Sequence, residues 1–176
     1  MKTIEINLYK FSELSEQAKK NALNKLSDIN IDYDWYQFTF EDCERIGIKI
    51  VEFDIYGRYI KGCLIINDLV DICNLIKKEH GEGCETYKTA INYLDQYDKL
   101  VAKHSKGLKG GEQVHEDNYD IFDEELKDLL FELRDDILQD YLNILRNEYE
   151  YRTSEEAIIE TIEANDYDFT EKGKLY

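Results

Sequence analysis

The stretch from Asn118 to Arg152 constrains the fold more than any other part of the chain. Apolar residues recur along it at intervals of three and four, from Phe122 to Ile144, which is the spacing of one face of an α-helix. Carboxylates crowd the opposite side of that helix. A helix of about thirty residues would be roughly 45 Å long at the standard rise. We therefore predict one long acidic helix in the C-terminal half.

Several carboxylates in this stretch are spaced four residues apart, as in Glu124, Asp128 and Glu132. Each like-charged pair at this spacing costs a few tenths of a kcal/mol in an isolated helix. Local helix stability therefore does not explain the pattern. Either burial of the apolar stripe offsets the repulsion, or a basic partner relieves it.

The net charge of −17 is concentrated in the same region. Residues 1–111 hold 18 acids and 16 bases, whereas residues 112–171 hold 21 acids and 4 bases. A negative field repels phosphate backbones and attracts basic proteins. We therefore predict a partner with a basic surface and no direct binding of nucleic acid. A charge that serves solubility alone is the competing interpretation.

Length and composition indicate a single α+β domain over residues 1–176, with sub-lobes at 1–80 and 84–164 as the alternative. There is no apolar run of about 18 residues, which predicts no membrane span. The first residues lack the apolar segment of a signal peptide. The four cysteines are scattered, as is typical of reduced thiols. These features predict a cytoplasmic protein.

Elsewhere the patterns predict a small antiparallel sheet packed with helices. The sheet would combine an N-terminal strand, a central hairpin and a C-terminal strand. Ser15 is the expected N-cap of the first helix, and Thr153 with Glu156 forms a capping box before the last one. The expected strands are 3–9, 48–55, 58–66 and 167–170, the last either as a terminal strand or as a hairpin with 174–176. The expected helices are 16–26, 33–46, 68–80, 84–105, 118–152 and 155–164.

An aromatic cluster lies between residues 33 and 40, where Trp35 is the only tryptophan. Such a cluster can serve as a stacking platform for nucleic-acid bases. Acids surround this one and no basic groove accompanies it, so packing in the core or against a protein partner is the favoured interpretation.

No residue pattern identifies a chemistry, and we predict no catalytic residue, no cofactor and no metal. Cys73, His80 and Cys84 are close enough in sequence to suggest zinc, but a fourth ligand is not evident. Glu52 and Asp54 with Lys61 imitate a two-metal nuclease only weakly. We therefore expect a binding protein and not an enzyme.

Two stretches resemble a family of small proteins encoded by bacteriophages and other mobile elements. Leu8–Lys19 is similar to the family's opening YKFDELSEEAK, and residues 153–174 are similar to its closing SDEAI and ANEYEFTEDGK segments. Tyr33–Tyr36 fits its tryptophan-bearing segment. The family has no established enzymatic activity, and some members carry an antitoxin-like label. Many relatives have Trp-Ser-Gln-Gly-Asp-Gly between the central strands; here Phe53–Tyr59 replaces it, so no role of that segment carries over.

The resemblance implies a phage accessory protein, and such proteins often block host defence. Together with the charge asymmetry it predicts an anti-CRISPR-type inhibitor whose acidic helix occupies the basic channel of a host nuclease, such as a CRISPR effector. An antitoxin or other protein-binding module, a nucleic-acid-processing enzyme and a structural phage protein are the alternatives, and a homodimer through the stripe 122–145 stays open. The expected partner-binding residues are Glu125, Asp128, Glu132, Asp135, Asp136 and Asp140.

Overall fold

The computed structural model of the protein describes residues 5–105 and 119–176. Over these residues the chain is α+β, as predicted, and contains six α-helices and two antiparallel sheets of two strands each. It divides into two compact units, one of residues 37–145 and the other of residues 1–36 with 146–176. These boundaries differ from the sub-lobes that we expected, and the single domain stays a prediction.

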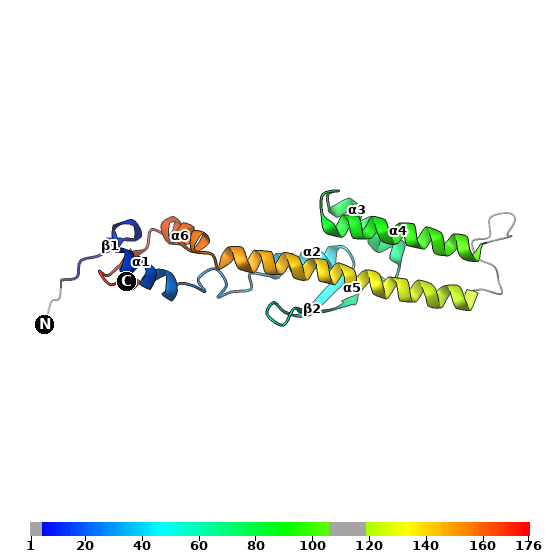
Figure 1. Cartoon of the computed structure of the whole chain (residues 1–176), viewed down its shortest axis with the longest axis horizontal. Helices are drawn as coiled ribbons and strands as arrows, with labels where there is room; N and C mark the ends of the chain where they lie inside the picture. The colour runs from blue at the N-terminus through cyan, green and yellow to red at the C-terminus, as the bar shows by residue number, and fades with distance from the viewer. Residues whose placement is uncertain (1–4, 106–118) are drawn as a thin grey trace. The chain divides into compact units, whose positions relative to one another are not determined.

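The larger unit contains a hairpin and four helical segments (Figure 1). Its helices α3 and α4 form a pair, and α4 runs alongside the first part of α5. Helix α5 is 34 residues long, as its apolar periodicity predicted, and it continues into the smaller unit. The elements are α2 (Gln37–Arg45), β2 (Ile48–Asp54), β3 (Tyr59–Leu64), α3 (Leu69–Glu79), α4 (Glu85–His104) and α5 (Tyr119–Arg152).

The hairpin of β2 and β3 confirms the predicted pairing of the two central β-rich runs. Ile50 pairs with Gly62 and Glu52 pairs with Lys61, which leaves Val51 as an extra residue in a β-bulge. A Cβ placed on Gly62 would lie 2.7 Å from a methyl group of Leu138. Glycine at this position therefore lets β3 approach α5 closely.

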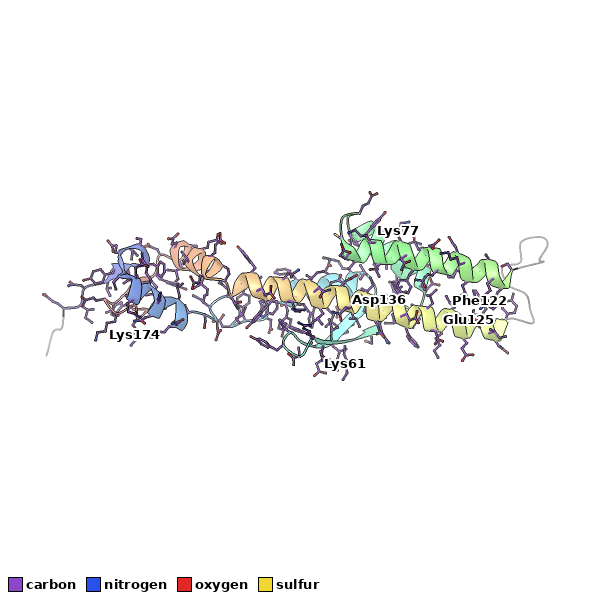
Figure 2. The ribbon with its side chains drawn as sticks, in the orientation of Figure 1. Lys61, Lys77, Phe122, Glu125, Asp136 and Lys174 are labelled. Atoms are coloured by element: carbon purple, nitrogen blue, oxygen red, sulfur yellow. The ribbon has the colours of Figure 1, made fainter. Side chains whose placement is uncertain are left out.

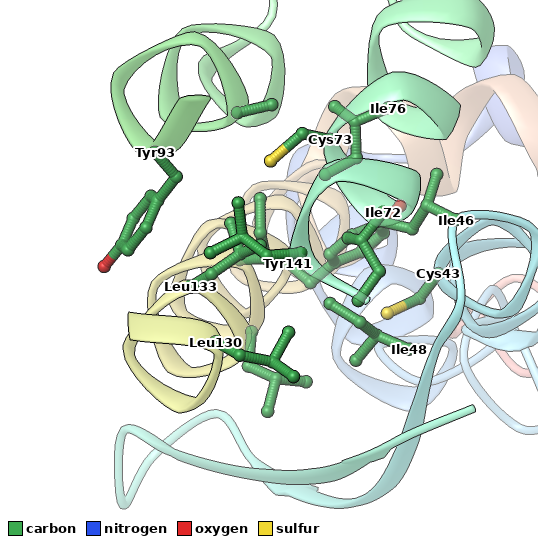
Figure 3. Close-up of a cluster of buried hydrophobic side chains, with 14 of the residues drawn as sticks. Cys43, Ile46, Ile48, Ile72, Cys73, Ile76, Tyr93, Leu130, Leu133 and Tyr141 are labelled. Carbon is green, nitrogen blue, oxygen red and sulfur yellow. The ribbon is translucent and has the colours of Figure 1, made fainter. Parts of the chain in front are cut away.

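The core of the larger unit collects apolar side chains from α2, β2, α3, α4 and α5 (Figure 3). Cys43, Cys73 and Tyr141 are among its fully buried members. The ring of Tyr93 lies at the edge of this cluster, and its hydroxyl points away from the other labelled side chains (Figure 3). The apolar stripe of α5 is thus buried within the chain, and this burial opposes the repulsion between the like-charged pairs.

The smaller unit is built around a separate two-stranded sheet in which β1 (Tyr9–Lys10) pairs with β4 (Asp168–Phe169). A 3-10 turn, η1 (Phe11–Glu13), leads into α1 (Glu16–Lys25), whose N-cap is Ser15, as predicted. Helix α6 (Glu155–Ala164) packs Ile158 and Ile162 into the same core as Phe169.

The sequence prediction of one sheet with a long N-terminal strand was wrong in detail. Residues 5–8 form no strand, and Ile6 and Leu8 are 53% and 38% exposed, because β4 offers only two residues for pairing. Residues 3 and 4 lie outside the described residues. The terminal strands pair with each other and not with the central hairpin.

Two predicted helix starts and one predicted N-cap were also wrong. Helix α2 begins at Gln37 and not at Tyr33. Helix α3 begins at Leu69 and not at Asp68, which is instead its N-cap and accepts the amide of Asp71 with its carboxylate. The N-cap of α6 is Ser154, because the Thr153 hydroxyl instead donates to the Tyr149 carbonyl at the end of α5. Among the described helices, no segment is both long and apolar enough to cross a membrane.

Candidate functional site

The acidic side of α5 is the candidate site, and its own periodicity divides the acids into two rows. Leu133, Ile137 and Tyr141 are fully buried and fix which side of the helix faces the core. Acids that flank this buried stripe next to α4 form the inward row, and acids on the solvent side form the outward row. The inward row is Glu125, Asp136 and Asp140; the outward row is Glu124, Asp128, Glu132 and Asp135.

The inward row is hydrogen-bonded to α4. The Tyr93 hydroxyl donates to Oδ2 of Asp136 at 2.7 Å, and the Thr89 hydroxyl donates to Oδ2 of Asp140 at 2.9 Å. Glu125 accepts from the Lys103 ammonium at 2.6 and 2.8 Å. Three of the six predicted partner-binding residues are therefore occupied within the fold.

At the end of the inward row, Glu125 contacts both Lys103 and His104. Oε2 of Glu125 lies 2.9 Å from Nε2 of His104, which is buried and packs edge-on against Phe122. Hydrogen bonds from Lys103 and then from His104 lower the pKa of the Glu125 carboxyl. Glu125 and Phe122 lie near the same end of α5 (Figure 2). This cluster joins the end of α4 to the start of α5.

Asp140 behaves differently because it is more buried. Burial raises the pKa of its carboxyl, and the hydrogen bond from Thr89 offsets only part of that effect. The pKa of the Tyr93 hydroxyl is raised by burial and by its bond to Asp136. These shifts have structural causes within the α4–α5 contact.

The outward row contains the other three predicted residues, Asp128, Glu132 and Asp135, together with Glu124, which we did not include. All four side chains are exposed. Asp135 accepts a hydrogen bond from its neighbour Arg134 at 2.8 Å. For Glu124, Asp128 and Glu132, no hydrogen bond or ion pair with another described residue is found. The outward row thus consists of exposed acids that make no hydrogen bond to α4 among the described residues.

A buried polar network around His80 was not predicted. Nδ1 of His80 lies 2.7 Å from the Thr86 hydroxyl, and its Nε2 lies 3.3 Å from Oδ2 of Asp42. Tyr141 donates its hydroxyl to the same oxygen at 2.8 Å, and Arg45 donates to Oδ1. Nε2 of His80 is buried, and its approach to Oδ2 lacks the geometry of a hydrogen bond.

The pKa of Asp42, the carboxylate of this network, reflects two opposing effects. Burial by itself would raise the pKa of Asp42, but hydrogen bonds from Arg45 and Tyr141 and the adjacent His80 outweigh it, so that the pKa is lowered. The order carboxylate, imidazole, hydroxyl imitates a nucleophilic triad. However, Thr86 is only 3% exposed, so its hydroxyl does not reach solvent in this conformation. The network links α2, α3, α4 and α5 and has a structural role.

No protein-family model, curated protein or solved structure matches this chain.

The remaining candidates from the sequence lie apart from the acidic side of α5. Cys73 is buried in the core, whereas Cys84 is exposed. Within residues 5–105 and 119–176, no group of three His, Cys, Asp or Glu side chains is placed to hold a metal ion. Glu52 pairs with Lys61 at 3.9 Å on the hairpin. None of these positions assembles a reaction centre with the others.

The aromatic cluster at residues 33–40 is divided between the two units. In the smaller unit Trp35 is buried against Tyr149, with ring centroids 5.9 Å apart. In the larger unit Phe40 packs against Phe53 at 5.6 Å. Phe38 is 81% exposed. The preferred interpretation, packing in the core, holds for Trp35, while Phe38 does not contribute to a core.

Proposed function

We propose that this protein is a phage-encoded inhibitor of a host defence nuclease and that it acts in the cytoplasm by binding a basic surface. The observation that carries the proposal is the outward row, in which four exposed carboxylates follow one face of a long helix. The resemblance to small phage proteins supplies the biological setting. A CRISPR effector nuclease, with a channel that is basic because it holds nucleic acid, is the proposed partner class.

The geometry of α5 suits this role. Glu124 and Asp135 are eleven residues apart, which is about 16 Å along a helix. The apolar stripe beneath the row is buried, so the carboxylates keep fixed spacings without help from a partner. A rigid row of negative charge can take the place of a phosphate backbone in a basic channel, and a cationic partner would relieve the repulsion within it.

The test is inhibition of target-DNA cleavage by a purified CRISPR nuclease. The outward row is neutralised with Glu124→Gln, Asp128→Asn, Glu132→Gln and Asp135→Asn. We expect the concentration for half inhibition to rise by at least about tenfold, and inhibition by the native chain to weaken as salt is added. A matched control removes the same charge elsewhere, with Glu155→Gln, Glu156→Gln, Glu163→Gln and Glu171→Gln.

If inhibition depends on where the carboxylates lie and not on net charge alone, the control variant should inhibit the nuclease as the native chain does. Equal inhibition by the outward-row variant would exclude that row as the binding surface. An absence of inhibition by the native chain across several nuclease classes would contradict the proposed function itself. Co-purification with a small toxin from the same mobile element would instead support the antitoxin alternative.

A further inference from the structure

A cavity of about 390 Å³ opens beside the outward row, between the start of α3, the middle of α4 and the first half of α5. Leu69 and Leu130 in its wall are buried core residues. Val70, Tyr97 and Leu126 are only partly buried, although they pack against the same core. The hydrophobic core of the larger unit is therefore open on this side. The volume of the cavity is within the range of pockets that bind small molecules or single side chains.

The rim of the cavity is acidic. Asp68 contributes from the N-cap of α3, and the exposed Asp123 contributes from α5. Lys127, the one base among the described residues of the rim, places its ammonium 5.8 Å from the ring centre of Phe131. Two carboxylates against one ammonium leave the rim negative, in a chain whose net charge is −17. An anionic occupant would be opposed, and a cationic one would be favoured.

We propose that this cavity receives an apolar side chain of the basic partner, one that is flanked by Lys or Arg. The inference rests on the proposed function and adds the recognition element that a row of charges lacks. Charges at a rim mainly raise the association rate, whereas an apolar anchor in a pocket supplies affinity and specificity. The apolar wall would bury the anchor, and Asp68 and Asp123 would pair with the cations beside it.

The test uses two synthetic peptides, Lys-Arg-Phe-Arg-Lys and Lys-Arg-Ala-Arg-Lys, and isotope-labelled full-length protein followed by NMR. We expect the Phe peptide to bind about tenfold more tightly than the Ala peptide, since only it can bury a ring. Its binding should shift the amide signals of Leu69, Val70, Leu126 and Leu130. Val70→Phe, which fills the cavity, should abolish the preference for the Phe peptide.

Asp123→Asn is the second variant. Its side chain is exposed, so the substitution leaves the fold intact even if Val70→Phe disrupts it. It should weaken both peptides by a few fold and reduce their salt dependence. Glu132→Gln, in the outward row, is the matched control and should leave the Phe preference unchanged. The inference would be overturned if the Phe and Ala peptides bound equally, or if the preference for Phe survived Val70→Phe. It would also be overturned if the acidic peptide Glu-Asp-Phe-Asp-Glu bound as tightly as Lys-Arg-Phe-Arg-Lys. Binding of N-acetylphenylalanine amide as tight as that of the Phe peptide would also overturn it, because a small-molecule site would then be indicated.

Failure of this inference can be told apart from failure of the proposed function. If the outward-row variant loses nuclease inhibition while Val70→Phe inhibits normally, the cavity is not used and the function stands. If the peptides discriminate as expected but no nuclease is inhibited, the cavity binds a basic segment of a different kind of partner.

Discussion

The hydroxyl of Tyr93 on α4 donates a 2.7 Å hydrogen bond to Asp136 on α5, so that an acid expected to face a partner instead holds two helices together. Tyr93 is 4% exposed, while Asp136 remains open to solvent on its other side. The bond therefore joins α4 to α5 at the edge of the core, where the buried side chains meet the solvent-exposed ones.

Tyr93→Phe should lower the free energy of unfolding by about 1 kcal/mol, the usual net value of a hydrogen bond whose remaining partner can be hydrated. Asp136→Ala should cost a similar amount, and the two changes together should cost less than their sum, since each removes the same bond. Urea denaturation of the two single variants and the double variant measures this coupling. Strict additivity would show that the bond contributes nothing to stability. Asp128→Ala, in the outward row, is the matched control and should leave stability within about 0.5 kcal/mol.

The periodicity of α5 predicted a long helix and its buried face, but not which acids were free. Apolar spacing identifies the stripe, whereas the acids that flank it can either face solvent or reach a neighbouring helix. A signal was present in the sequence. Thr89 and Tyr93 are four residues apart, as are Asp136 and Asp140, and two antiparallel helices can match such pairs. Finding it required knowing that α4 and α5 are neighbours.

The His80 network shows a different limit of sequence reasoning. Its members come from four helices or helix ends, and Asp42 and Tyr141 are 99 positions apart. No local spacing or capping rule connects them, and only the packing of α2, α3, α4 and α5 brings them together. The cavity beside Val70 was missed for the same reason, because a gap in a core is a property of side-chain packing.

Helix α6 provides a direct test of a sequence rule that misplaced a cap by one residue. The Ser154 hydroxyl accepts the amide of Ala157 at 3.2 Å, whereas the Thr153 hydroxyl donates to the Tyr149 carbonyl. Ser154→Ala should therefore lower the free energy of unfolding by about 1 kcal/mol, and Thr153→Ala should cost less. Thermal denaturation of both variants checks the order. If Thr153→Ala costs more, the capping box read from the sequence is correct and the assignment to Ser154 is wrong.

The buried thiols predict that the larger unit loses stability in alkali. Burial raises the pKa of Cys73 to about 12, and it also raises the pKa of Cys43. Unfolded thiols release their protons above about pH 8.5, where the folded ones remain protonated. The unfolded state then binds fewer protons than the native state, so the free energy of unfolding falls with rising pH. The slope is about 1.4 kcal/mol per pH unit for each thiol.

Urea denaturation between about pH 8 and about pH 10 measures that slope. Cys73→Ala should make the pH dependence of the free energy of unfolding shallower by the contribution of one thiol, whatever the variant's stability at neutral pH. Cys63→Ala removes an exposed thiol and should leave the slope unchanged. A native-like slope in Cys73→Ala would contradict the assignment.

Gly173 in the smaller unit should tolerate no side chain. Its backbone has φ of +75°, and a Cβ there would overlap the carbonyl oxygen of Ala18 in α1. A positive φ alone costs a non-glycine residue about 1–2 kcal/mol, and the overlap with backbone adds to that cost. Gly173→Ala should therefore lower the free energy of unfolding by more than about 2 kcal/mol.

Gly83 is the matched control, since a Cβ there meets nothing within 4 Å and its φ is not in the left-handed range. Gly83→Ala should be neutral or stabilising by up to about 1 kcal/mol, because it mainly restricts the unfolded chain. Equal effects of the two substitutions in thermal denaturation would contradict the close approach of the C-terminal turn to α1.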